Sequence, residues 1–201
     1  MKNLSIENLK KDMESFILTE NDSYIHSYSD FINYFQNIDW IEKHHLVIAS
    51  HFVYGWMPTI LKLDTKNVDE VLSALNGVKA GHPVSENQLE MIKQCVNNSM
   101  VGTSKLLHFI NPNLYAIWDS RIFRYLTGKK YPYGIEKPKA YSEYLKALNK
   151  IAEHVDYRSL HFEIERNFEY EISPLRAIEI LMFETDRERQ RKSRSATISN
   201  S

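Results

Sequence analysis

The sequence predicts an all-α fold arranged as a two-lobed helical bundle, and three observations lead to this prediction. Apolar residues recur with the period of a helix through most of the 201-residue chain. Helix-capping patterns stand at the starts of several of these segments. No segment shows the alternation of apolar and polar residues between turns that is typical of a strand. About eight to ten short helices are therefore expected.

The first half of the chain contains five segments with helical periodicity. One of them ends at Gly55, just before the helix breaker Pro58. Two others follow capping boxes, in which a polar cap residue precedes Glu or Gln by three positions. The predicted helices cover residues 3–18, 24–36, 39–54, 68–76 and 86–97.

The second half opens with the stretch 99–128, which predicts a glycine-bearing turn, a short helix, a loop and a second helix. A further helix is expected over 139–154, and another from Ser173-Pro174 to about Arg187, because proline favours the first helical position. The polar residues 190–201 are predicted to be a disordered tail. We expect one domain over residues 1–189, with its central element at 86–128.

Charge is distributed unevenly along the chain. The net charge is −1 overall, but it is −5 over residues 1–100, +6 over residues 101–150 and −2 over residues 151–201. A basic middle in a near-neutral protein suggests an anionic partner such as a phosphate backbone. The alternative is a solvated, lysine-rich surface.

Several classes of protein are excluded or disfavoured by composition. Cys95 is the only cysteine, so an intrachain disulfide and a four-cysteine metal site are impossible. His44, His45 and His51 do not share a helix face with a completing carboxylate, so no metal is expected. No apolar run approaches the length of a membrane span. We expect a cytoplasmic monomer that needs no cofactor and does not contact a membrane.

One six-residue pattern carries the functional prediction. Asp119-Ser120-Arg121-Ile122-Phe123-Arg124 resembles the Asp-Thr-His-Val-x-Arg pattern of the helix-hairpin-helix DNA glycosylases. Upstream, Met100-Val101-Gly102-Thr103-Ser104-Lys105 resembles the Gly-Val-Gly-Thr-Lys hairpin of the 8-oxoguanine glycosylase branch. The resemblance covers about 30 residues closely. It implies a helix-hairpin-helix element, a pocket between two helical lobes and DNA as the partner.

The resemblance implies roles for Asp119 and Lys105. Asp119 would be the catalytic carboxylate, which stabilises positive charge on the sugar as the N-glycosidic bond breaks and positions the attacking water. Lys105 would be the Schiff-base nucleophile of a glycosylase with lyase activity, or else a phosphate contact. We predict that the two residues face one pocket. From the residues alone, Asp119 also fits a simple helix cap.

The target base must leave the DNA stack and enter a pocket, usually between aromatic or apolar side chains. The candidate base-pocket residues are Trp118, Tyr54, Trp56 and His108. The two tryptophans and His108 also fit a place in the core. The candidate DNA-backbone contacts are Gly102, Thr103, Arg121, Arg124, Lys129 and Lys130.

The sequence is compatible with two kinds of substrate base. The base is either an oxidised purine such as 8-oxoguanine, as in DNA repair, or a hypermodified phage base, which would make the protein an antiviral defence enzyme. Two other functions are also compatible with the sequence. One is a non-catalytic helical module that binds nucleic acid, and the other is a helical regulator that binds another protein.

Overall fold

The computed structural model describes residues 4–18, 26–55, 57 and 59–199. Ten α-helices lie in this part of the chain, so the predicted all-α class is confirmed. Extended pairing in the described ranges is limited to one antiparallel bridge between Leu63 and Val96. None of the described helices is long and apolar enough to cross a membrane. The chain divides into two compact units, which are described separately.

Unit 2 comprises Glu20–Trp118 and Gly134–Leu145. Its helices are α3 (Tyr28–Gln36), α4 (Lys43–Gly55), α5 (Val68–Lys79), α6 (Glu86–Cys95), α7 (Met100–Ile110) and the first part of α9 (Pro138–Ala152).

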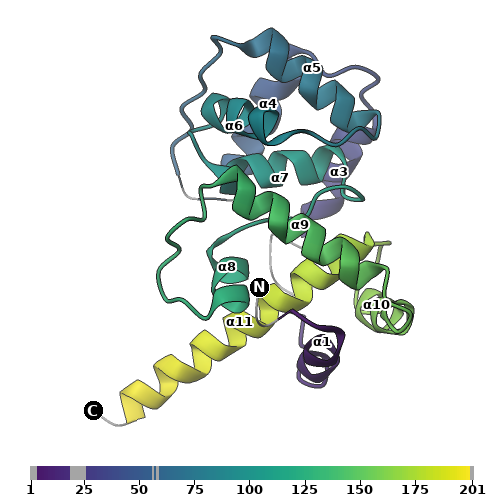
Figure 1. Ribbon diagram of the computed structural model, residues 1–201, viewed down its shortest axis with the longest axis vertical. Helices are drawn as coiled ribbons and strands as arrows, with labels where there is room; N and C mark the ends of the chain where they lie inside the picture. Colours follow the sequence, from purple (N-terminus) through teal and green to yellow (C-terminus); the bar gives the residue numbers. More distant parts are fainter. Residues whose placement is uncertain (1–3, 19–25, 56, 58, 200–201) are drawn as a thin grey trace. The chain divides into compact units, whose positions relative to one another are not determined.

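Helix α7 is the central helix of unit 2. It packs against α3, α4, α5 and α6 (Figure 1). All but one of its eleven residues are buried, Val101 being the exception. Such burial on every side is expected of a helix that lies in the middle of a core rather than at its surface.

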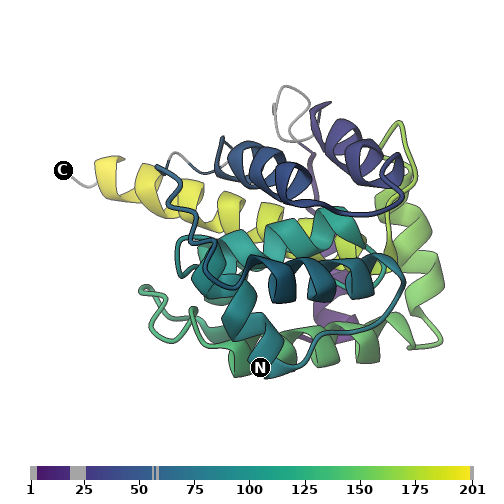
Figure 2. The same ribbon diagram turned by 90° about the horizontal axis from the view of Figure 1, so that it is seen from above.

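Unit 1 comprises Met1–Thr19, Asp119–Tyr133 and Lys146–Ser201. Its helices are α1 (Ile6–Met13), α8 (Ser120–Thr127), the last part of α9, α10 (Tyr157–Glu165) and α11 (Pro174–Ser199). The long helix α11 packs against α1, α8 and α10, and Figure 2 shows its yellow C-terminal turns.

Polar side chains join the helices of unit 1. The Tyr125 hydroxyl on α8 donates a 2.7 Å hydrogen bond to Asp12 on α1, and Arg189 on α11 forms a 2.8 Å ion pair with the same carboxylate. The hydroxyl of Tyr157 donates a 2.6 Å bond to the carbonyl of Pro174. Buried polar groups of this kind must be paired to be tolerated, so they fix which helix faces meet.

Two helix starts follow the predicted capping chemistry, and a third follows only the predicted position. Ser85 and Gln88 form a complete capping box at α6. The Ser173 hydroxyl accepts from the backbone N–H of Arg176 at the start of α11. Asn67 precedes α5 as predicted but makes no side-chain cap bond. Helix α10 was not predicted, because its apolar stripe of Tyr157, Leu160 and Ile164 is short.

The end of the chain differs from the expected tail. Helix α11 continues to Ser199, whereas the sequence predicts disorder over 190–201. The segment lacks Gly and Pro, and Glu188 pairs with Arg191 at 2.9 Å and with Lys192 at 3.6 Å. Pairs at these spacings stabilise a helix. Polar composition alone therefore does not distinguish a solvated helix from a disordered tail.

Candidate functional site

Asp119 is the N-cap of α8. Its backbone is extended, and its Oδ1 atom accepts 2.9 Å hydrogen bonds from the backbone N–H groups of Arg121 and Ile122. A carboxylate at this position also interacts favourably with the positive end of the helix dipole. The helix ends at Gly128, whose left-handed conformation (φ 69°) suits glycine. The predicted capping aspartate is therefore held in one orientation by its own helix.

Both arginines of the six-residue pattern face Asp186 on α11. Arg124 donates to both carboxylate oxygens, with its Nη2 atom 2.6 Å from Oδ2. These bonds raise the pKa of the Arg124 guanidinium, and the charge of Asp119 adds to the rise. Arg121 lies 3.9 Å from the same carboxylate, and its guanidinium stands over the ring of Phe183. Asp186 has no local signal in the sequence, because it lies in a helix of alternating charges.

Lys129 and Lys130 follow α8 on a loop and are exposed. The ammonium group of Lys130 lies 5.6 Å from the centre of the Tyr131 ring. Both of these predicted backbone contacts are therefore accessible to solvent.

The predicted glycine-bearing turn is wrong. Gly102 and Thr103 lie inside the first turn of α7, and both are buried. Gly102 N donates to Ser99 Oγ and Thr103 Oγ1 donates to the Ser99 carbonyl. The reversal between α6 and α7 is made by Asn97 (φ 59°) and Asn98 (φ 52°) instead. Asparagine tolerates this left-handed conformation better than other residues with a side chain.

Gly102 has a packing role. A Cβ atom built on it would lie 2.9 Å from two ring atoms of Tyr54, so only glycine fits beside that ring. The Tyr54 hydroxyl donates a 2.9 Å bond to the carbonyl of Val96. Burial raises the pKa of Tyr54 to about 12. Lys105 lies on the same helix and is also buried, with 8% of its surface exposed.

His108 and Trp118 are both core residues of unit 2. His108 lies 2.7 Å from the carbonyl of Tyr115 through Nδ1 and 2.9 Å from the Tyr28 hydroxyl through Nε2. Because a carbonyl only accepts, Nδ1 must carry the proton. Trp118 donates its indole N–H to the carbonyl of Ile135 and packs against the ring of Tyr144. The fourth predicted base-pocket residue, Trp56, lies outside the described residues.

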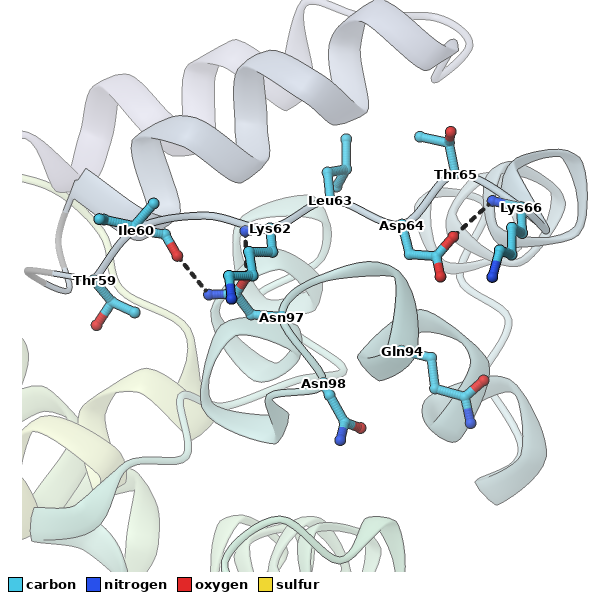
Figure 3. A pocket seen from close by; sticks show the side chains of 10 residues that line it. All are labelled: Thr59, Ile60, Lys62, Leu63, Asp64, Thr65, Lys66, Gln94, Asn97 and Asn98. Carbon is cyan, nitrogen blue, oxygen red and sulfur yellow. Dashed lines mark hydrogen bonds between the residues drawn. The ribbon is translucent and has the colours of Figure 1, made fainter.

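An open pocket of about 890 Å³ lies in unit 2, beside the turn between α6 and α7 (Figure 3). The Asn97 amide donates to the carbonyl of Ile60 and accepts from the N–H of Lys62, which fastens the turn to the segment 59–66. None of the described residues that the sequence predicts for the site lines this pocket. Its walls combine polar and apolar surface, and its lining residues are Thr59, Ile60, Lys62, Leu63, Asp64, Thr65, Lys66, Gln94, Asn97 and Asn98.

Asp119 belongs to unit 1 and Lys105 to unit 2. The prediction that they face one pocket stays a prediction. In the described part of the chain, no three His, Cys, Asp or Glu side chains are grouped so that they could hold a metal ion. In comparisons with known proteins, no family model, curated protein or solved structure matches this chain.

Proposed function

We propose that the protein is a DNA glycosylase that excises a damaged or modified base, with Asp119 as its catalytic carboxylate. One observation carries the proposal: the six-residue pattern begins at a helix N-cap, where two backbone N–H groups fix the carboxylate. A fixed carboxylate needs little reorganisation when positive charge develops beside it. The residues that follow, 120–135, contain four basic and no acidic side chains, which favours a phosphate backbone nearby.

The chemistry of the proposal balances without a cofactor. The bond between the sugar carbon and the base nitrogen breaks, and the base leaves with the bonding electrons. The sugar carries positive charge in the transition state, which Asp119 stabilises. A water molecule then bonds to the sugar carbon and gives up a proton, for which Asp119 is the acceptor. The departing base takes up a proton from solvent, and Asp119 afterwards releases its proton to solvent, so that one water molecule is added overall.

Lys105 forms the second part of the proposal. In a glycosylase with lyase activity its uncharged amine would attack the sugar carbon and displace the base, and a Schiff base would form when the sugar ring C–O bond opens and the nitrogen loses its protons. Trapping with borohydride tests this role, because reduction turns the Schiff base into a stable adduct. An adduct that Lys105→Ala abolishes supports the amine route. Base release without any adduct assigns the reaction to water and leaves Lys105 without a covalent role.

The hairpin element of the proposal is the pair of helices α6 and α7, joined by residues 96–99. Support comes from the short connection and its two left-handed asparagines, which reverse the chain within four residues. Here Gly102 and Thr103 lie in the helix after the turn. The exposed residue Asn98 is therefore a better candidate for a backbone contact than either of them.

The deciding experiment measures base release from DNA duplexes that contain normal, oxidised or glucosylated bases. Asp119→Asn keeps a good helix cap but removes the negative charge. We expect it to lower the rate by about 10²- to 10⁴-fold. The matched control is Asp156→Asn, which changes another aspartate directly before a helix. Full activity in Asp119→Asn would show that Asp119 is only a cap.

A second function is favoured by one observation. Asp119 accepts hydrogen bonds from the N–H groups of its own helix and can serve there as a cap alone, so the pattern also suits a non-catalytic module that binds nucleic acid. Such a module predicts salt-dependent DNA binding, no base release from any substrate, and an affinity that Asp119→Ala leaves unchanged or improves. Absence of any DNA binding at moderate salt would instead favour a regulator that binds protein.

A further inference from the structure

Two tyrosines on the loop after α8 expose their rings. Tyr131 is 59% exposed and Tyr133 is 81% exposed, although both are large side chains that a fold would usually cover. The two ring centres are 6.2 Å apart, and the ring planes are tilted by 54°. Because the rings are not parallel, one flat molecule cannot lie sandwiched between them. Each ring instead offers a separate face.

A backbone hydrogen bond constrains the loop between the two tyrosines. The N–H of Tyr133 donates a 3.0 Å hydrogen bond to the carbonyl of Tyr131, which closes a tight turn around Pro132. Proline has a fixed φ and is suited to the centre of such a turn. A partner that uses both rings therefore meets a surface that has lost part of its conformational freedom in advance.

Charge distinguishes these rings from the other exposed aromatic rings of the described chain. Trp40 is 65% exposed and Phe162 is 71% exposed, but acidic residues stand beside both: Asp39 and Glu42 near Trp40, and Glu163 and Glu165 near Phe162. Tyr131 and Tyr133 follow Lys129 and Lys130 directly, and no acidic residue occurs from 120 to 135. The next acidic residue, Glu136, accepts a hydrogen bond from the backbone N–H of Met100. Aromatic faces combined with cations are typical of surfaces that bind unpaired nucleic-acid strands.

We propose that Tyr131 and Tyr133 stack against two unpaired bases of a DNA strand, while Lys129 and Lys130 contact the phosphates beside them. The choice of DNA rests on the proposed function, but the stacking does not depend on Asp119. In a base-excising enzyme, this loop would hold bases exposed by local opening of the duplex. Any base has a face to stack on, so the contact is indifferent to sequence.

The experiment compares three labelled probes by fluorescence anisotropy: an oligothymidine of about 12 nucleotides, an abasic strand of equal length, and the duplex. The abasic strand keeps the phosphates but has no bases. We expect the unmodified protein to prefer oligothymidine over the abasic strand. Each ring removed by Tyr131→Ala or Tyr133→Ala should weaken oligothymidine binding by about fivefold or more and leave binding of the abasic strand unchanged.

Two variants serve as controls for the rings. Tyr131→Phe with Tyr133→Phe keeps the stacking faces and should bind within about twofold of the unmodified protein. Phe162→Ala removes an equally exposed ring from an acidic setting and should leave affinity unchanged. Lys129→Ala with Lys130→Ala should lower the slope of log affinity against log salt by about 1.4, since each phosphate contact contributes about 0.7 on a single strand.

Equal affinity for oligothymidine and the abasic strand would overturn the proposal, as would unchanged oligothymidine binding in a variant that combines Tyr131→Ala with Tyr133→Ala. Failure here and failure of the proposed function are separable. If base release depends on Asp119 but the tyrosines do not affect binding, the stacking proposal is wrong and the proposed glycosylase function is supported. If no base is released but the protein distinguishes the probes through Tyr131 and Tyr133, the stacking proposal is supported and the proposed glycosylase function is wrong.

Discussion

Helices α7 and α8 both contain residues that the sequence predicts for the site, yet they differ in how those residues are used. Helix α7 is buried on every side, and its unusual residues have packing partners within unit 2. Helix α8 buries only Ile122, Phe123, Tyr125 and Leu126 and keeps a polar face with two arginines. The motif in the core helix α7 is therefore explained by its packing contacts, whereas the motif on the half-exposed helix α8 requires a further explanation.

The strongest test of this contrast is the ion pair of α8. Asp186→Ala leaves the Arg124 guanidinium without its bidentate partner, and the Arg124 side chain is 23% exposed. We expect a loss of about 2–3 kcal/mol in unfolding free energy, somewhat below the range for fully buried pairs. Urea unfolding followed by circular dichroism measures it.

The matched control for Asp186→Ala is Asp156→Ala, which breaks a pair of similar length with Lys10. Both side chains of that pair are 49% exposed, so the loss should be about 1 kcal/mol at most. Equal losses in the two variants would mean that burial does not strengthen the α8 pair and that Arg124 is available for other contacts.

In α7 the corresponding test concerns the packing of Gly102 against Tyr54. Gly102→Ala places a methyl group against the buried ring of Tyr54, and overpacking of this kind costs about 1–3 kcal/mol. The better helix propensity of alanine returns up to ~1 kcal/mol, so we expect a net loss of about 1–2 kcal/mol.

Gly77→Ala is the control for the Gly102 prediction, because Gly77 also lies within a helix but has its nearest neighbour 4.0 Å away. It should be neutral or stabilising. Combining Gly102→Ala with Tyr54→Leu should recover part of the loss by making room. A stable Gly102→Ala variant would contradict the packing role and would reopen a functional role for this glycine.

Alkaline pH should weaken both units through their buried tyrosines. Burial raises the pKa of Tyr54 to about 12 in unit 2, and it also raises the pKa of Tyr125 and Tyr157 in unit 1. In the unfolded chain these hydroxyls lose protons near pH ~10. Stability is therefore complete below about pH 10 and falls as the pH rises towards 12, by about 1.4 kcal/mol per pH unit for each such group.

Urea titrations at several alkaline pH values, with tyrosinate absorbance recorded in parallel, measure this loss. Tyr54→Phe should reduce the slope of unfolding free energy against pH by the contribution of one tyrosine, about 1.4 kcal/mol per pH unit. A free energy of unfolding that stays constant through this range would show that the tyrosines are accessible to hydroxide in the folded protein.

Much of the fold follows from local chemistry in the sequence. The capping patterns at Ser85 and Ser173 mark helix starts correctly because a cap is decided by residues three positions apart. The sequence also identifies Asp119 as the residue before a helix. The close approach of Gly102 to Tyr54 could not be predicted, because nothing local links positions 48 residues apart. A glycine kept for a neighbour looks the same in sequence as a glycine kept for a turn.

The ion-pair partners of the charged residues likewise could not be predicted from local sequence. Arg124 and Asp186 are 62 positions apart, and each stands among residues that would suit a solvated surface. The six-residue pattern suggests a use for Arg124 on DNA, but only the packing of α8 on α11 reveals its bond to Asp186. The ion pairs of the described residues do not include Lys129 or Lys130. Both lysines are exposed, as expected for cations that contact a phosphate backbone.

The smallest expected effect on stability is also the one that separates capping from catalysis. Asp119→Asn should change the unfolding free energy by less than about 0.5 kcal/mol, because asparagine caps helices about as well as aspartate. Asp119→Ala removes the acceptor for the N–H groups of Arg121 and Ile122 and should cost about 1 kcal/mol. If the two variants differ in stability but lose base release equally, the carboxylate acts in the reaction. If base release follows stability, so that Asp119→Asn keeps it, the aspartate serves α8 alone.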